Sequence, residues 1–507
     1  IHGRDQSIDV ELAARRDGTM TGLRVKNYAN MGAYLSLAAP GVPTWLFALI
    51  VPGCYTIQDY ACDVYGVLTN TTPTDAYRGA GRPEAAYLME RMVDLLARKL
   101  GMDPVDVRRK NFIPADAFPY TNAGTLIYDS GNYQGTLDLA LQMAGYDTFR
   151  QEQQRLRQQG RYVGLGLSTY VEVCGLAPSK AAGAMGFQGG LWEPAIVRVL
   201  ATGKVVVLTG TSPHGQGEET TFAQLVGEEL GVPVEDVDVV HGDTGAIPMG
   251  WGTYGSRTTA VGGTAILKAT QKVVEKAKRL AAHLLEAAPD DIVHDHGRYH
   301  VAGTAGRAVT IQDVALQANL AWNLPDGMAP GLEESHFHDP TNFTFPFGAH
   351  VCMVEVDAET GEVAIQRYIA VDDVGRVINP MIVDGQVHGG VAQGIGQALY
   401  EHAIYDEAGN LITGTMMDYT VPNATQIPTI ETARTETPCP HNLTGVKGVG
   451  ETGTIASSQA VVNAVVDALA PLGITHIDMP LTPERVWRAM AQARQAQQAQ
   501  SAPSSIQ

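Results

Sequence analysis

The chain has 507 residues, of which 45% are hydrophobic, and its formal net charge is -19 at pH 7. That length can bury a large core and is typical of about three domains. The excess of 54 acidic over 35 basic residues argues against a surface for nucleic acid or anionic membrane, and favours small neutral substrates or partner subunits.

The first predicted elements are a strand hairpin and a helix that follows a glycine-rich turn. Residues Ile8 to Ala13 alternate in polarity as a strand does, and Arg16-Asp17-Gly18 is typical of a hairpin turn. The segment 76–83 leads into a helical pattern over Glu84 to Leu100, with a proline suited to the first helical turn. Residues Asn111 to Gly131, rich in Pro, Asn, Thr and Gly, are the best candidate linker between a first and a longer second domain.

The middle of the chain alternates strands and helices irregularly. It predicts, in order, a strand over 194–201, a tight turn at 202–203, a strand over 204–209, a helix over 222–230, a strand over 237–241 and a helix over 265–285. Two strands joined by a tight turn and covered by a helix imply mixed or antiparallel sheets, and so an α+β architecture.

The last third predicts another hairpin and two glycine-containing helices. A strand over 351–356 pairs with one over 363–371 around a turn at 357–362, and a helix starts after Asn379-Pro380. A second helix covers 458–469, directly after the turn Gly448 to Gly453. The residues from Ala491 onward are rich in Gln, Ala and Ser, so we expect disorder there.

Glycine is concentrated beside these helices. The chain contains 55 glycines, roughly one residue in nine against a usual share of about 7%. The excess falls in the segments 76–83, 214–217, 250–263, 385–396 and 448–453. Glycine lets a ligand approach the backbone, and a helix start offers free N–H groups to an anion. The pattern indicates one large phosphate-bearing ligand held from several sides; for any single segment, an ordinary strand-to-helix turn is the simpler alternative.

Glu451 is the one group in the Gly448–Gly453 turn that can take a proton. A carboxylate in such a turn suits a catalytic base held against a bound cofactor. An acidic residue favoured by the dipole of the next helix is the alternative, and for this turn alone it is the stronger one.

Cysteines and histidines give no metal-binding pattern. The five cysteines, Cys54, Cys62, Cys174, Cys352 and Cys439, lack the spacing of zinc or iron-sulfur ligands, so we predict no thiolate-bound cluster. His336, His338 and His350 are close in sequence, but Pro340 and the aromatic run 343–347 indicate a core segment instead of a metal site. Motifs of metalloproteases, serine hydrolases and P-loop proteins do not occur.

The ends of the chain and its hydropathy bear on location. No apolar run reaches the ~18 residues needed to span a bilayer, and no charged-then-apolar leader is present. An odd number of scattered cysteines is most simply explained by a reduced, cytoplasmic protein. The chain starts with Ile1, directly ahead of a strand, which favours a start inside a domain.

Taken together, the motifs resemble the large, molybdopterin-binding subunit of the xanthine dehydrogenase and aldehyde oxidase family, the molybdenum hydroxylases, especially its carbon monoxide dehydrogenase-like branch. The matching segments are 2–6, 76–85, 215–217, 372–396 and 448–453. They occur in the family's order, and the resemblance runs from the first residue to about Arg488.

The resemblance implies an α+β fold of mixed sheets with covering helices, in two elongated molybdopterin-binding domains. Residues 1–115 would be the C-terminal part of the first domain, 116–488 the second domain, and 489–507 a disordered tail. The family's N-terminal part, which carries another glycine-rich cofactor loop, is missing. The chain is therefore expected to be a fragment or to work with a second polypeptide that supplies that portion.

The resemblance implies a molybdenum ion held by the dithiolene of molybdopterin cytosine dinucleotide, with no metal ligand from the protein. Glu451 matches the family's base, which deprotonates the metal-bound hydroxide as that oxygen attacks the substrate carbon. Gln216 matches the glutamine that hydrogen-bonds the apical oxo group. These two are the expected catalytic residues.

Further cofactor contacts are implied by the glycine-rich segments. The loop from Arg78 lies against the metal centre in the family, and later segments lie near the pterin and its phosphates. The expected set is Arg78, Gly79, Ala80, Gly81, Gly215, Gln216, Gly217, Ser256, Arg257, Thr258, Gln393, Gly394 and Gly450.

Departures from the family pattern bear on the substrate. Carbon monoxide oxidisers carry a copper-binding cysteine in the loop after Tyr77-Arg78, whereas this chain has Gly79-Ala80-Gly81, so we predict no carbon monoxide site. Xanthine oxidisers have a stacking phenylalanine where this chain has Ala80, which leaves room for an aldehyde or a differently held N-heterocycle. Tyr77, Ala80 and Asp243 are the expected pocket residues, although a loop-capping role for Asp243 is simpler.

The family passes electrons from molybdenum to partners, so we expect a small iron-sulfur subunit with [2Fe-2S] clusters and a medium FAD subunit, in a dimer of heterotrimers. The expected function is a hydroxylase that inserts water-derived oxygen into a C–H bond. The alternatives are a subunit that is carbon monoxide dehydrogenase-like in sequence alone, and a non-catalytic cofactor-binding or assembly subunit. An NAD-dependent dehydrogenase is discounted, because Gly394-Ile395-Gly396 lacks the third glycine of its motif.

Overall fold

The N-terminal residues form a three-stranded sheet of β1 (Gln6–Ala14), β2 (Met20–Gly32) and β3 (Asp59–Leu68). The computed structural model describes residues 1–247 and 249–501. β1 and β2 pair antiparallel, with Ile8 opposite Asn27, and β3 joins β2 in parallel. Alternate side chains of β1 are half-buried, as expected of a strand covered on one face. The predicted hairpin is confirmed.

Short helices and one small hairpin connect this sheet to the rest of the core. They are η1 (Val42–Ala48), α1 (Arg82–Leu100), α2 (Pro104–Asn111), β4 (Tyr120–Thr121), β5 (Ile127–Tyr128), α3 (Tyr133–Ala144) and α4 (Tyr146–Gln158). The predicted linker over 111–131 is not an external connection, because its Leu126 and Tyr128 are buried in the same core as the first sheet. Together with Phe112 and Ile113, they anchor this polar segment to that core.

A four-stranded sheet lies at the centre, in the order β16 (Ile430–Thr435), β15 (Val363–Asp373), β14 (Phe347–Val356) and β6 (Tyr162–Val171). β14 pairs antiparallel with both neighbours, and β16 joins β15 in parallel. Helix α10 (Thr452–Ala468) packs on β6 and β14 beside α9 (Pro380–Leu399), whereas α3 packs on β14 and β15. Nearly every residue of β14 is buried, as expected of a strand covered on both faces.

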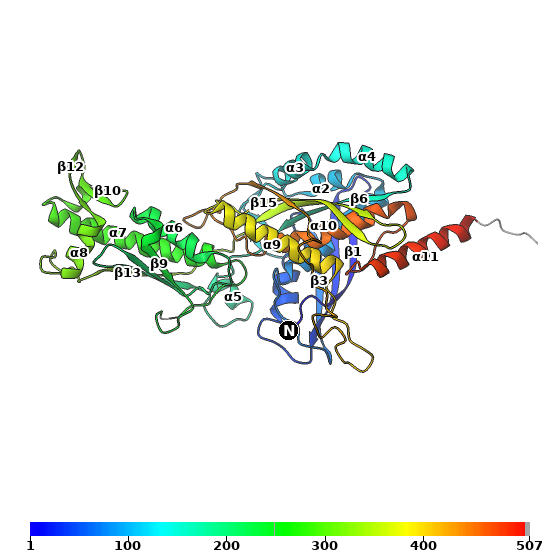
Figure 1. The fold of residues 1–507 in the computed structure, drawn as a ribbon, viewed down its shortest axis with the longest axis horizontal. Coiled ribbons are helices and arrows are strands. Elements are labelled where there is room, and N and C mark those ends of the chain that lie inside the picture. Colours follow the sequence, from blue (N-terminus) through cyan, green and yellow to red (C-terminus); the bar gives the residue numbers. More distant parts are fainter. Residues whose placement is uncertain (248, 502–507) are drawn as a thin grey trace, which may run out of the picture.

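A distal domain, residues 179–338, is inserted between β6 and β14 (Figure 1). Its main sheet has the order β13 (Leu332–His338), β7 (Glu193–Val199), β8 (Val205–Thr209) and β9 (Val237–Val240). The remaining elements are α5 (Ser179–Ala184), α6 (Glu218–Leu230), η2 (Val234–Asp236), η3 (Thr258–Gly263), α7 (Thr264–Leu284), η4 (Pro289–Asp291), β10 (Ile292–Asp295), β11 (Arg298–Val301), β12 (Thr304–Thr310) and α8 (Ile311–Leu320). This domain has its own hydrophobic core.

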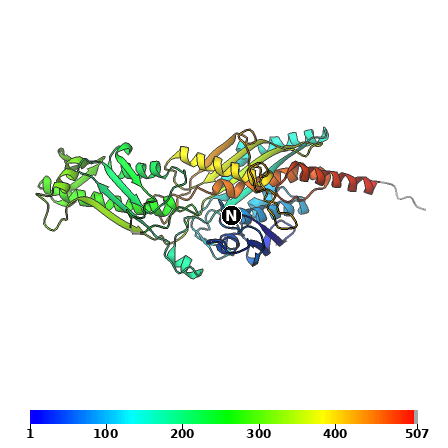
Figure 2. The same cartoon turned by 60° about the horizontal axis from the view of Figure 1, so that its bottom comes forward.

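Three large hydrophobic cores occur within the described residues, and they do not divide at residue 115. One core joins residues from the first sheet, α1 and α3 with residues of β6, β14 and β15, so it includes both sides of that position. A second core lies between β14, β15, α9 and α10. The third is that of the distal domain, which gives the molecule its elongated shape (Figure 2). The mixed α+β fold class is confirmed.

Two helices at the C-terminal end are longer than predicted. Helix α10 begins at Thr452, six residues earlier than expected. Thr452 to Ser457 are all buried, and α10 packs against α9. Helix α11 (Pro483–Ser501) extends through most of the segment predicted to be disordered. Its Ala, Gln and Arg residues favour helix even without an apolar stripe. Residues 502–507 of the predicted tail lie outside the described residues. The described part of the chain contains no helix long and apolar enough to cross a membrane.

Candidate active site

A cavity of about 440 Å³ lies between the central sheet and the distal domain. That volume is within the usual range for small-molecule sites. Its lining comes from five segments, represented by Arg78, residues 214–221, residues 253–259, residues 374–386 and residues 446–451. The cavity therefore brings together residues from each of the five glycine-rich regions picked out in the sequence.

Helices begin at this cavity from several directions. Within the described residues, the first residues of α6, η3, α9 and α10, or the positions just before them, belong to its lining. Each helix start carries N–H groups without intrahelical partners and a partial positive charge. Convergence of such ends favours an anionic ligand, which agrees with the phosphate-bearing ligand expected from the glycine pattern.

Glu451 sits at the N-cap of α10, and its carboxylate is held by three groups distant in sequence. Oε1 accepts the backbone N–H of Gly79 at 2.8 Å. Oε2 lies 2.5 Å from Nη2 of Arg82 and accepts the hydroxyl of Ser256 at 3.1 Å. The side chain is 14% exposed and faces the cavity. The carboxylate is thus fixed in orientation and still accessible from one side.

A second carboxylate lies behind this pair. Oε1 of Glu172 is 3.7 Å from Nη2 of Arg82, and neither side chain is exposed. Burial raises the pKa of Glu172 to about 8, although the Arg82 charge opposes the shift. Glu172 is therefore mostly protonated at neutral pH. The single positive charge of Arg82 then faces one carboxylate, that of Glu451.

The loop 78–81 brings Gly79 to Glu451 through an unusual backbone. Gly79, Ala80 and Gly81 have φ of 99°, 36° and 86°, all in the left-handed region. A Cβ at Gly81 would lie 2.5 Å from the carbonyl oxygen of Val42, so glycine is required there. Since Ala80 tolerates this conformation poorly, packing around the loop must hold it.

Arg78 fastens the same loop to the turn that carries the carboxylate. Its Nε donates to the carbonyl of Gly450 at 2.6 Å, and its Nη2 donates to the carbonyl of Gln386 at 3.0 Å. Arg4 donates to the carbonyl of Arg78 from the other side. The positive charge of Arg78 remains at the cavity surface.

Gln216 lies in a turn with fewer constraints. Its Oε1 accepts the backbone N–H of His214, which leaves the amide Nε2 able to donate to a ligand. Gly215 has a φ of 95°, and a Cβ at this position would meet no atom within 4 Å, whereas Gly217 starts α6 against Ile382. Gln216 and Gly215 line the cavity, so both are positioned to contact a bound group.

Several expected residues lie elsewhere. Arg257 is buried and uses its guanidinium on Glu193, at 2.5 Å, and on backbone carbonyls, so it anchors the loop instead of facing the cavity. Gly394 packs against Ser457 of α10, and Gln393 reaches Arg78 at 3.5 Å. These positions support the site from behind its lining.

The expected substrate-pocket residues are also outside the lining. Asp243 is exposed and accepts the N–H of Gly245 at 2.8 Å, the turn-capping role that was the simpler prediction. Ala80 is buried at 6% exposure, and Tyr77 stacks under Arg4, whose guanidinium carbon is 4.6 Å from the ring centre. Ser256, Thr258 and Gly450 do line the cavity, as expected.

Lys447 is a cavity residue that the sequence interpretation missed. It is 3% exposed, and among the described residues its Nζ has no hydrogen-bond partner. Burial lowers the pKa of this amine, and Nζ lies 4.8 Å from the centre of the Phe347 ring. A buried amine without a partner at a cavity wall indicates a place for an anionic or hydrogen-bonding ligand. Its signal in the sequence was its position directly before Gly448.

Comparison with known proteins bears on this geometry. Models of the molybdopterin cofactor-binding domain match residues 1–112 and residues 139–428. The chain is 43% identical to the carbon monoxide dehydrogenase large chain of Hydrogenophaga pseudoflava, over 96% of this chain and 61% of that protein. It is 36% identical to the nicotine 6-hydroxylase large subunit of Paenarthrobacter nicotinovorans, over 96% of this chain and 60% of that protein.

A solved structure agrees with these matches. The chain superposes on quinoline 2-oxidoreductase from Pseudomonas putida 86 with a TM-score of 0.90 and 37% sequence identity, covering 96% of this chain and 62% of that one. The chain thus spans about 60% of the length of the relatives it matches.

Proposed function

This chain belongs to the molybdopterin cofactor-binding family of molybdenum hydroxylase large subunits, and we propose that it is the catalytic subunit of such a hydroxylase. The observation that carries the proposal is Glu451, a carboxylate held by Gly79, Arg82 and Ser256 at the edge of the cavity where helix ends converge. An assembly subunit has no use for a carboxylate held so tightly and still open to a ligand.

The residues present fit a molybdenum-pterin dinucleotide. The cavity offers helix N-termini for phosphate, the unpartnered amine of Lys447 and the charge of Arg78. The amide of Gln216 is available as a donor, and its contact with the metal's oxo group stays a prediction. The cytosine dinucleotide form is likewise part of the proposal, supported by the helix N-termini at the cavity, whose free N–H groups suit a pyrophosphate.

When bound, the molybdenum-pterin group supplies the two-electron oxidation. Insertion of water-derived oxygen into a C–H bond releases two protons and two electrons. We assign Glu451 to accept a proton through its cavity-facing carboxylate. Gly79 and Ser256 keep the two oxygens oriented, and Arg82 holds one of them in a buried ion pair.

The proposed substrate is a carbon of an aldehyde or N-heterocycle. Among the described residues, no cysteine belongs to the cavity lining, and the Arg78 loop continues Gly79-Ala80-Gly81, so these residues provide no thiolate to hold Cu(I). The nearby thiol of Cys174 is buried behind Gly448 and bonded to Thr344 at 3.1 Å, and burial raises its pKa. Relatives whose names specify nicotine and quinoline favour an aromatic N-heterocycle.

The proposal includes partners that remove the electrons. We propose a small iron-sulfur subunit, a medium FAD subunit and a polypeptide or preceding segment that supplies the rest of the relatives' length, in a dimer of heterotrimers in the cytoplasm. The scattered cysteines support this division, because the four that are buried pack in different parts of the fold. The clusters are then carried by another chain.

The test begins with the complex purified from its native host. Near-stoichiometric molybdenum with a released cytosine dinucleotide, together with turnover of aldehydes or N-heterocycles and none of carbon monoxide, is the expected result. Carbon monoxide turnover would overturn the substrate assignment. Absence of both molybdenum and pterin from a folded complex would favour the non-catalytic assembly role.

A further inference from the structure

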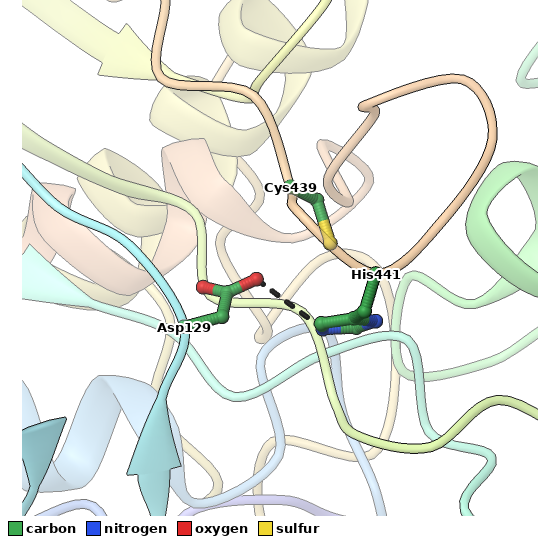
Figure 3. A group of neighbouring side chains, drawn as sticks. All are labelled: Asp129, Cys439 and His441. Carbon is green, nitrogen blue, oxygen red and sulfur yellow. Dashed lines mark ion pairs between the residues drawn. The ribbon is translucent and has the colours of Figure 1, made fainter. Parts of the chain in front are cut away.

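Three side chains with metal-binding atoms meet outside the cavity lining. Asp129 follows β5, and Cys439 and His441 lie on the loop between β16 and α10 (Figure 3). One donor atom of each lies within 4.8 Å of the others. The three side chains point toward one another in Figure 3, although Asp129 is some 310 positions from the other two.

The cluster is buried and its hydrogen bonding is incomplete. Asp129 and Cys439 are 9% and 3% exposed. Over the part of the chain that the structure describes, Asp129 Oδ2 and His441 Nδ1 have no hydrogen-bond partner, although Oδ2 lies 3.3 Å from His441 Nε2. Buried polar atoms of folded proteins nearly always have a hydrogen-bond partner. Two neighbouring buried atoms without one therefore indicate a bound group at this place.

The loop that carries two of the donors is held before any ion binds. Cys439 lies between Pro438 and Pro440, and its N–H donates to the carbonyl of Gly445 at 2.9 Å. Asn442 donates to the carbonyl of Val446 at 2.8 Å. Such a closed loop loses little conformational freedom when its side chains bind an ion.

We propose that Asp129, Cys439 and His441 bind a borderline divalent transition metal ion such as Zn²⁺, separate from the molybdenum centre. Thiolate, imidazole and carboxylate are the donors that zinc prefers, and water completes four-coordination. The ion joins the segment after β5 to the loop that continues into Lys447 and Glu451. Its role is to fix the wall of the cavity that carries the base.

The same groups can hold a proton instead of a metal. Burial lowers the pKa of His441, but the neighbouring Asp129 carboxylate and Cys439 thiol outweigh that effect and raise it to about 10. His441 Nε2 also lies 2.8 Å from the carbonyl oxygen of Phe343. The experiment therefore has to separate a bound ion from a bound proton.

The test uses the purified complex, treated with a chelator and then titrated with Co²⁺ while zinc, cobalt and molybdenum are measured by elemental analysis. We expect one equivalent of cobalt, with a thiolate-to-cobalt charge-transfer band, and unchanged molybdenum. Cys439→Ser should abolish the band, and His441→Gln should bind cobalt at least tenfold more weakly. Cys62→Ser, which removes a half-buried thiol elsewhere, is the matched control and should keep the band.

The proposal is overturned if wild-type protein binds no cobalt, or if Cys439→Ser retains the same band. Where a variant fails to fold, the wild-type protein still decides the matter. Its melting temperature must rise when Zn²⁺ is added to chelator-treated protein, because an ion that binds only the folded state stabilises it. An unchanged melting temperature assigns the cluster to a proton-sharing network.

Discussion

The two walls of the cavity are built differently. At the wall of Glu451, the functional carboxylate is bonded to Gly79, Arg82 and Ser256, which come from other parts of the chain. At the wall of residues 214–217, Gln216 bonds back to its own turn. The Glu451 side chain is therefore fixed by residues distant in sequence, whereas the amide Nε2 of Gln216 remains free to donate a hydrogen bond. With the roles proposed for Glu451 and Gln216, proton transfer would use a side chain fixed by packing, and cofactor binding a side chain with a free donor.

Glu451→Gln tests the first wall most directly. The amide keeps the shape of the side chain but cannot accept the proton, so turnover should fall by about 10²- to 10⁴-fold. Molybdenum content, measured in the same preparation, should be unchanged. Substantial residual turnover with full loading would remove Glu451 from the role of base.

Arg82→Met should show how strongly that wall depends on its buried cation. The change leaves Glu451 and Glu172 without their shared partner, and loss of one member of a buried ion pair costs about 3–5 kcal/mol. Urea unfolding measures this loss. Arg24→Met removes an exposed pair with Glu11, 71% and 72% exposed, and as the control should change stability by no more than about 0.5 kcal/mol.

Gly394→Ala examines the helix packing behind the same wall. A Cβ at this position would lie 1.7 Å from Oγ of Ser457, so α9 and α10 must move apart at a cost of about 1–3 kcal/mol. Gly385→Ala, on the same helix with open space around it, is the matched control and should be neutral or stabilising. Equal effects of the two changes on thermal unfolding would contradict this packing role.

Glu172→Gln sharpens the electrostatic side of the comparison. The folded-state pKa of Glu172 is raised from 4.5 to about 8 by burial, so the protonated acid stabilises the fold fully below pH 4.5. That contribution is lost as pH rises through 8. The Gln variant, which stays neutral, should lose less stability than wild type between pH 5 and about 9. Parallel stability–pH curves would show that Glu172 is not the group concerned; Glu11→Gln, at the surface, is the control.

Gln216→Ala should have the smallest effect and only on ligand binding. Loss of one donor costs about 0.5–1.5 kcal/mol, so cofactor occupancy at limiting cofactor should fall by about two- to tenfold. Melting of the cofactor-free chain should not change, because the side chain bonds only within its turn among the described contacts. A lower melting temperature of the variant would show that the Gln216 side chain, like that of Glu451, contributes to packing of the fold.

The sequence predicted the hairpins, most helices and the glycine segments, because periodicity and turn residues are local signals. It also predicted Glu451 and Gln216 as catalytic residues and Ser256 as a cofactor contact; all three line the cavity, and their roles stay predictions. It could not assign Arg82 and Glu172, since contact between two fully buried side chains 90 residues apart has no local pattern. Arg257, Gln393 and Gly394 match motifs, yet burial and helix contact give them supporting positions.

The cluster of Asp129, Cys439 and His441 escaped the sequence for the same reason. Cys439 and His441 form a C-x-H pair, a spacing that does not by itself predict a metal site, and the third donor comes from a distant segment. The domain division near residue 115 stays a prediction: the family models break between residues 112 and 139, whereas one hydrophobic core includes residues from both sides.

The insertion of the distal domain between β6 and β14 has a consequence for biosynthesis. Val171 pairs with Phe347, so β6 emerges from the ribosome about 175 residues before its partner. At usual translation rates of about 5–20 residues per second, that strand waits for roughly 10–35 seconds. The distal domain, with a core of its own, can fold in this interval, while the apolar edge of β6 stays open to aggregation and to chaperones.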